Sequence, residues 1–151
     1  MQSYYGKAVR GQTGGLLGRL LPTPAGGYIK RLMDVLVVED DADARAAMAK
    51  ALTASGFTVT EADNGLVGLQ HVSQRRFDAI VCDLRLPYLP GGAFYEELAG
   101  RDPALADRVI FVSAIAHDPA VRDFLERTGR PYLQKPYELD ELIATVRRVA
   151  A

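Results

Sequence analysis

Hydrophobic and polar positions follow two alternating patterns from Asp34 to the end of the chain. Three apolar runs are typical of strands buried on both faces, at 34–39, 77–83 and 108–114. Two shorter runs predict more peripheral strands, at 57–62 and 131–135. Segments with helical character lie between and after them, at 41–56, 64–76, 92–101, 118–129 and 138–150. Five strands in strict alternation with five helices predict an α/β domain, a doubly wound, mostly parallel five-stranded sheet covered on both faces.

The first 33 residues do not share this pattern. They are rich in glycine, are interrupted by two prolines, and contain five basic residues and no acidic one. A flexible basic tail and a weak targeting peptide both fit this composition, and Met33 could itself be the natural start. We expect residues 1–33 to form a disordered basic extension and residues 34–151 to form the domain.

Composition narrows the class of protein. Hydrophobic residues make up 48% of the 151 positions and charged residues 25%, which is typical of a globular domain, and no apolar run is long enough to span a bilayer. A single cysteine cannot form an internal disulfide, so a cytoplasmic location is the default expectation. Beyond residue 33 the chain has 13 basic and 19 acidic residues, an acidic balance that argues against nucleic acid as a main partner. Without a spanning apolar run, we expect no membrane partner either.

Polar residues stand where the predicted strands end. Glu39 and Asp40 end the first strand, Asp83 the third, Ser113 the fourth and Lys135 the fifth. In an open parallel sheet, ligands bind outside the carboxyl ends of the strands, near the point where the strand order reverses. Carboxylates that converge there repel one another unless a cation lies among them, and oxygen ligands with room for water favour Mg²⁺.

The acids alone leave another interpretation open, because strand-end acids are often solvated loop residues or helix caps. Asp41, for example, is expected to turn away and start the next helix. Asp83 favours the metal site over this interpretation, since an apolar strand places it at the same edge of the predicted sheet as Glu39 and Asp40. A carboxylate beside Mg²⁺ can attack phosphorus and form an acyl phosphate, and Lys135 and Ser113 would supply a charge and a hydroxyl to the phosphoryl oxygens.

These residues together resemble the receiver domain of two-component response regulators, the CheY-like family. The resemblance covers residues 34–151, about four-fifths of the chain. It rests on the spacing of the strand-end residues and on four short motifs: VVED, CDLRLPYLPGG, VSA and LQKPY.

The resemblance implies a role for each strand-end residue. Asp83 would accept a phosphoryl group from a phosphohistidine on a histidine kinase or a histidine phosphotransfer protein. Mg²⁺ would be held by Glu39, Asp40, Asp83 and the backbone carbonyl of Arg85. Lys135 would pair with a phosphoryl oxygen.

The resemblance also implies a switch. Ser113 would move to bind the phosphoryl group, and Tyr132 would turn inward in response. The alternative interpretation of Tyr132 is a half-exposed strand tyrosine, and we slightly favour the switch. Pro136 would follow a cis peptide bond. The domain would then be a signalling phosphoacceptor, not an enzyme, with only self-catalysed phosphoryl transfer and dephosphorylation.

Three rival functions are weaker. A phosphatase of the haloacid dehalogenase type needs a second aspartate two residues after the nucleophile, where this chain has Arg85. A flavodoxin-like FMN site needs a phosphate loop after the first strand, where this chain is acidic. A receiver-like interaction module that is not phosphorylated would not need all five strand-end residues.

The output is expected to pass through another protein. The chain ends at Ala151, just after the last predicted helix, which suggests a single-domain regulator without a DNA-binding segment. Its target would bind the face formed by residues 118–129, 131–135 and 138–150. The alternative is a receiver that works with a hybrid histidine kinase, as a phosphorelay intermediate or a phosphate sink. Homodimerisation on phosphorylation stays open.

Overall fold

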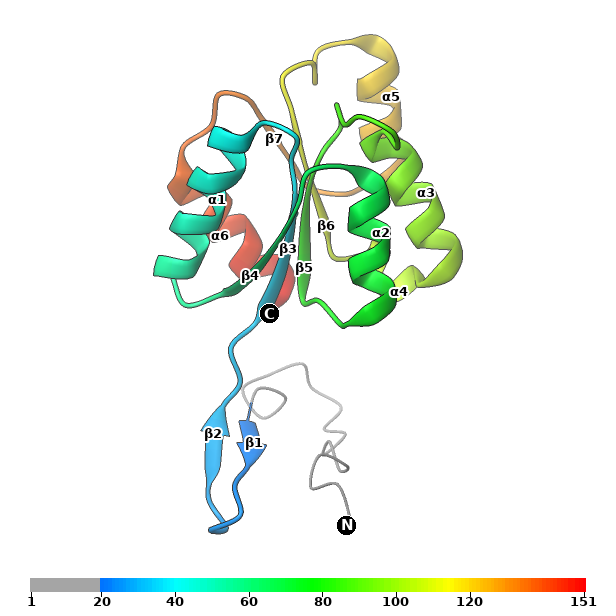
Figure 1. Cartoon of the computed structure of the whole chain (residues 1–151). Helices are drawn as coiled ribbons and strands as arrows, with labels where there is room; N and C mark the ends of the chain where they lie inside the picture. The colour runs from blue at the N-terminus through cyan, green and yellow to red at the C-terminus, as the bar shows by residue number, and fades with distance from the viewer. Residues whose placement is uncertain (1–19) are drawn as a thin grey trace.

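The structure of the protein is a computed structural model, in which residues 20–151 are described (Figure 1). The strands are β1 (Leu20–Pro22), β2 (Tyr28–Lys30), β3 (Asp34–Val38), β4 (Thr58–Ala62), β5 (Ala79–Asp83), β6 (Val109–Ser113) and β7 (Tyr132–Gln134). The helices are α1 (Ala42–Ala54), α2 (Gly65–Gln74), α3 (Gly91–Arg101), α4 (Pro103–Ala106), α5 (Pro119–Thr128) and α6 (Leu139–Ala150). All five predicted strands and all five predicted helices are present, while α4 is an additional single turn.

Five parallel strands form the central sheet, in the order β4-β3-β5-β6-β7. The chain passes from β3 to β4 on one side and then returns to β5 on the other side, so the strand order reverses beside β3. The predicted doubly wound α/β fold is therefore confirmed. It puts the carboxyl ends of β3 and β5 at the position where such sheets bind ligands.

The sheet has a hydrophobic core on each face. Successive side chains of β3 alternate between the two cores: Val35 and Val37 pack with one, Leu36 and Val38 with the other. Helices α1 and α6 cover the first face, and α2, α3 and α5 cover the second (Figure 1). Burial on both faces explains why the central strands are continuous apolar runs.

Local capping sets several helix boundaries. Asp41 is the N-cap of α1, as predicted, and its carboxylate accepts a hydrogen bond from the Ala44 N–H at 2.8 Å. Asp102 caps the short α4 in the same way, with Pro103 as its first residue. Within residues 20–151, no helix combines the length and the apolar character needed to cross a membrane.

An antiparallel hairpin precedes the domain. Strands β1 and β2 pair from Leu20 with Lys30 to Pro22 with Tyr28, and a hydrogen-bonded turn at Thr23 joins them. Residues 20–33, which we expected to be disordered, contain these two short paired strands, whose side chains are mostly exposed. The remaining part of that prediction, residues 1–19, lies outside the described residues.

Arg31 connects the hairpin to the domain. Its guanidinium donates two hydrogen bonds to the Asp78 carboxylate, at 2.9 and 3.2 Å, and lies 3.6 Å from that of Asp34. The bond to Asp78 raises the pKa of Arg31. Asp78 also accepts from the Asp34 N–H at 2.8 Å, so this ion pair is fixed to the first residue of β3.

Removal of the hairpin should leave the domain folded. A chain that begins at Arg31 should melt within about 4 °C of the full chain, since β1 and β2 contribute no residue to either core. A chain that begins at Met33 also lacks the Arg31–Asp78 ion pair. Its free energy of unfolding should fall by a further ~1 kcal/mol or less, the usual contribution of a partly exposed ion pair. Thermal unfolding of the three chains measures both steps, and a large loss on the first truncation would contradict the assignment of residues 34–151 as an autonomous domain.

Candidate functional site

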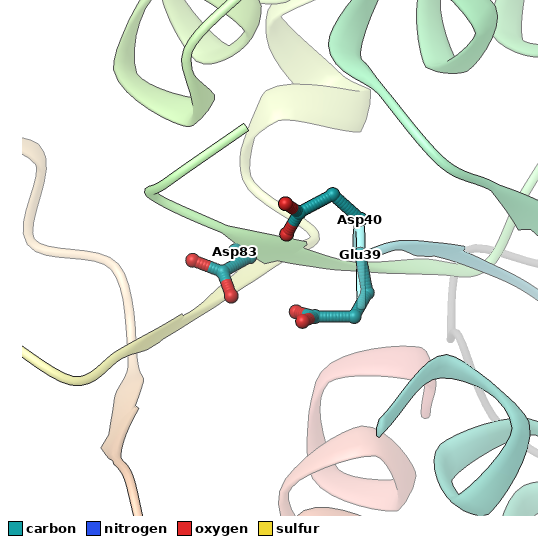
Figure 2. A group of neighbouring side chains, drawn as sticks. All are labelled: Glu39, Asp40 and Asp83. Atoms are coloured by element: carbon teal, nitrogen blue, oxygen red, sulfur yellow. The ribbon is translucent and has the colours of Figure 1, made fainter. Parts of the chain in front are cut away.

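The register of the sheet brings the predicted acidic residues together. Val38 of β3 lies opposite Cys82 of β5, so the next residues, Glu39 and Asp83, leave the sheet side by side. Carboxylate oxygens of Glu39, Asp40 and Asp83 lie within 4.8 Å of one another. Figure 2 shows the two side chains that follow β3 reaching toward Asp83 at the end of β5.

The three acids differ in exposure. Glu39 is 1% exposed and Asp83 is 5% exposed, whereas Asp40 lies at the surface. The cluster therefore combines two buried carboxylates with one that solvent reaches. Cys82 is fully buried in the core, and burial raises the pKa of its thiol well above the usual range, so it remains neutral.

Lys135 brings a cation into the cluster from the end of β7. Its Nζ lies 2.5 Å from Asp83 Oδ2 and 3.3 Å from both carboxylate oxygens of Glu39. The peptide bond between Lys135 and Pro136 is cis, as predicted. The ammonium group therefore bridges the two buried carboxylates.

The protonation of the cluster reflects this crowding. Burial and the adjacent Asp83 carboxylate raise the pKa of Glu39 to about 8, against the opposing effect of Lys135. Burial alone would lower the pKa of Lys135, but the hydrogen bond to Asp83 and the charges of both carboxylates outweigh it, and its pKa is raised. Lys135 thus stays charged, but its positive charge does not fully offset the burial of Glu39 and the repulsion from Asp83.

Ser113 and Arg85 both lie at the site. Ser113 is 1% exposed at the end of β6, where its Oγ accepts a hydrogen bond from the Ile115 N–H at 3.0 Å. The Ser113 carbonyl accepts from the Lys135 N–H at 2.8 Å, which ties the two strand ends together. The Arg85 N–H donates to Asp83 Oδ1 at 2.7 Å, which fixes that carboxylate. The role of the Arg85 carbonyl as a metal ligand stays a prediction.

Tyr132 is the one predicted residue that lies away from the acids. It is the first residue of β7 and is 49% exposed, so the ring is in an outward, half-exposed position. Its role as a switch stays a prediction.

The loop from β5 to α3 closes against the site. The Gly91 N–H donates to the Leu84 carbonyl at 3.2 Å, and a Cβ at Gly91 would lie only 2.2 Å from the Asp83 carbonyl oxygen. Only glycine permits this approach. Beside it, a pocket of about 440 Å³ is lined by Asp40 and by loop residues Leu84, Arg85, Leu86, Pro87 and Pro90.

Two further residues that the sequence analysis did not select contribute to the site. Arg45 of α1 donates to the Glu39 carbonyl at 2.8 Å and pairs with the Glu61 carboxylate at 3.5 Å, so it supports the turn that presents the acids. Tyr137 is half-buried, and burial, with Glu39 and Asp83 adding to it, raises its pKa to about 12. Arg45 could have been suspected because it lies on the first turns of the helix that Asp41 caps.

The cluster is chemically suited to Mg²⁺. All three side chains supply hard carboxylate oxygens, the ligands that this ion prefers, and the open side leaves room for water. The raised pKa of Glu39 supports the same conclusion, since a second cation beside Lys135 would stabilise the charged form of this carboxylate.

Comparison with known proteins identifies the family. The sequence pattern of the response regulator receiver domain matches residues 35–147. The chain belongs to this family. It is therefore a receiver of two-component signalling, and receivers of this kind are phosphoacceptors in signalling pathways.

Proteins with similar sequences include transcription regulators. PrrA of Mycobacterium tuberculosis is 35% identical over 113 residues, which are 75% of this chain and 48% of PrrA. The DNA-binding regulator NtrC of Escherichia coli K12 is 32% identical over 114 residues, 76% of this chain and 24% of NtrC. The chain therefore spans only a quarter to a half of these relatives.

A solved receiver also resembles this chain. The receiver of the sensor histidine kinase PA1611 from Pseudomonas aeruginosa, solved with a magnesium ion in its active-site cleft, superposes with a TM-score of 0.70 at 27% identity and covers 79% of this chain and 98% of that receiver.

The raised pKa of Glu39 predicts a pH-dependent effect on stability. Because the folded state holds this proton more tightly than the unfolded state, it contributes stability below pH 4.5 that is lost as the pH rises to about 8. Glu39→Gln removes that loss, so without divalent cations the variant should melt above the wild type at pH 8.5, by roughly 4 °C or more, and the difference should shrink at pH 5.5. Melting curves in EDTA at both pH values test this, and a pH-independent difference would contradict the assigned cause.

Proposed function

We propose that this receiver accepts a phosphoryl group on Asp83 from the phosphohistidine of a histidine kinase or a histidine phosphotransfer protein, with Mg²⁺ bound at Glu39, Asp40 and Asp83. The observation that carries the proposal is the pairing of Asp83 with Lys135 inside a cluster of two further carboxylates. An isolated strand-end aspartate would need neither a lysine nor two additional acids. Family membership supports the same function.

The proposed transfer is a substitution at phosphorus. An Asp83 carboxylate oxygen forms a bond to phosphorus while the bond from phosphorus to the donor imidazole nitrogen breaks. The electron pair of the broken bond stays on the imidazole, which is released neutral or takes up a proton from water. When bound, Mg²⁺ would neutralise charge on the phosphoryl oxygens.

Residues of this chain would prepare and stabilise the transfer. The Arg85 N–H holds one Asp83 oxygen, which leaves the other oxygen to attack once Lys135 moves from it to the incoming phosphoryl group. Ser113 supplies a hydroxyl at the end of the neighbouring strand, because among residues 20–151 its Oγ is engaged only as an acceptor from the Ile115 N–H. Hydrolysis of the acyl phosphate by water, without a partner, would return the domain to its resting state.

The output surface that we propose consists of α5, β7 and α6. The strand that carries Ser113 contacts α5 through aromatic rings, since Phe111 of β6 and Phe124 of α5 lie 5.4 Å apart, edge to face. Tyr132 of β7 lies on the same surface. A shift of Ser113 toward a phosphoryl group would therefore change the packing under this surface, as a population shift between two arrangements.

The pathway context that we propose is a single-domain regulator in the cytoplasm that acts on a target protein and does not itself bind nucleic acid. The acidic balance of residues 34–151, with 13 basic and 19 acidic residues, supports the part of this proposal that concerns nucleic acid. The alternative is a phosphorelay intermediate or phosphate sink, and the likeness to the receiver of a sensor kinase favours it.

The phosphoacceptor assignment predicts a specific mass change. Incubation with Mg²⁺ and acetyl phosphate should add one alkali-labile phosphoryl group to the wild type and none to Asp83→Asn, because the amide cannot attack phosphorus. Intact-mass spectrometry measures this, with EDTA as the metal-free control. Labelling of Asp83→Asn at another residue would defeat the assignment.

The Lys135 ammonium and the proposed Mg²⁺ should have roles that a single substitution can separate. Lys135→Ala removes a positive charge from the acids, so Mg²⁺ affinity, measured by calorimetry, should be retained or increased. The amide shifts of Ser113 and Tyr132 on phosphorylation, measured by NMR, should be lost or strongly reduced. Lys50→Ala, at an exposed lysine of α1, is the matched control, and equal loss of metal binding and switching in Lys135→Ala would contradict this division.

A further inference from the structure

The loop between β5 and α3 contains an unusual backbone conformation at Tyr88. Its φ is +65°, and it is the only non-glycine residue with positive φ in the part of the chain that the structure describes. The Leu89 N–H donates to the Pro87 carbonyl at 2.7 Å across it, which makes the segment a three-residue γ-turn. A γ-turn with positive φ is rare and strained, and a bulky aromatic residue is poorly suited to it.

The rest of the loop holds this turn in place. The Gly91 N–H bonds to the Leu84 carbonyl and closes the loop at its base. Leu89 lies against the first residue of α2, Gly65, where a Cβ would be 2.3 Å from the Leu89 carbonyl oxygen. Such strain persists only where the surroundings fix it, and it is concentrated at functional positions.

The Tyr88 side chain does not stabilise the domain by packing. It is 81% exposed, the highest value among the large hydrophobic side chains of residues 20–151. Pro87, the first residue of the turn, and Pro90, just after it, line the pocket that Asp40 also lines. The strained turn therefore exposes an aromatic ring in the loop that borders the acidic cluster.

The position of the loop indicates what the ring contacts. Asp83 is 5% exposed, so a protein donor must place its phosphohistidine at the mouth of the site and cover the surrounding loop. Tyrosine is well suited to such an interface, because its ring is rigid and apolar and its hydroxyl can bond to a partner. We propose that Tyr88 is a recognition residue for the protein that donates the phosphoryl group, an inference that rests on the proposed function.

The test separates recognition from chemistry. Wild type, Tyr88→Asn and Tyr88→Phe are labelled with acetyl phosphate, and by every histidine kinase and phosphotransfer protein encoded in the source genome, each phosphorylated beforehand. Asparagine tolerates positive φ and removes the ring, whereas phenylalanine keeps the ring. Tyr28→Asn is the matched control, since Tyr28 is also exposed but lies on the hairpin.

The expected result is a selective loss. With the donor that transfers fastest to the wild type, Tyr88→Asn should lower kcat/KM at least about tenfold, mainly through KM, while labelling by acetyl phosphate is unchanged. Its melting temperature should equal or exceed that of the wild type. Tyr88→Phe and Tyr28→Asn should behave like the wild type in both assays.

Several results would overturn the inference. The first is an unchanged rate of transfer from the protein donor to Tyr88→Asn, and the second is an equal loss of labelling by acetyl phosphate. The third is a lower melting temperature of Tyr88→Asn, and the fourth is a wild type that acetyl phosphate labels but no protein donor does. Failure of the proposed function is distinguishable from these, because the wild type would then be labelled by neither kind of donor.

Discussion

The mutual repulsion of Glu39, Asp40 and Asp83 is the constraint on which this structure depends. Their oxygens lie within 4.8 Å of one another, and two of the three side chains are buried. Lys135 offsets part of this cost by bonding to both buried carboxylates. Because Lys135 contacts both buried carboxylates, the charge on any one of these four residues affects the others.

The sheet supplies the stability that holds this unit together. Strands β3, β5 and β6 are buried on both faces between two separate cores, so their ends cannot move apart without disturbing the packing of α1, α2, α3, α5 and α6. The rigid sheet therefore holds three carboxylates beside a single lysine side chain. Such a site favours a divalent cation, which would add to the positive charge that Lys135 supplies.

Most of the fold follows from local patterns in the sequence, and the acidic cluster follows from a rule of sheet topology. The central strands are recognisable because burial on both faces requires continuous apolar runs, and Asp41 is recognisable as a cap. Strand order is what brings Glu39 beside Asp83, and the rule that ligands bind at strand ends in such sheets anticipates it.

The features that could not be predicted depend on contacts between distant residues or on unfavourable local conformations. The hairpin consists of three-residue strands with little burial, so it lacks a periodic signal. Arg31 reaches Asp78, which is 47 positions away in the sequence. Tyr88 is the extreme case, because nothing in the preferences of tyrosine indicates a positive φ.

The position of the hairpin has a consequence for how the domain can be tethered. It enters β3 at the amino end of the sheet, whereas the acidic cluster lies at the carboxyl end, on the opposite side of the domain (Figure 1). An attachment through residues 20–30 would therefore leave the mouth of the site facing outward. The domain could be fused, labelled or immobilised there while a partner protein still has an unobstructed approach to Asp83.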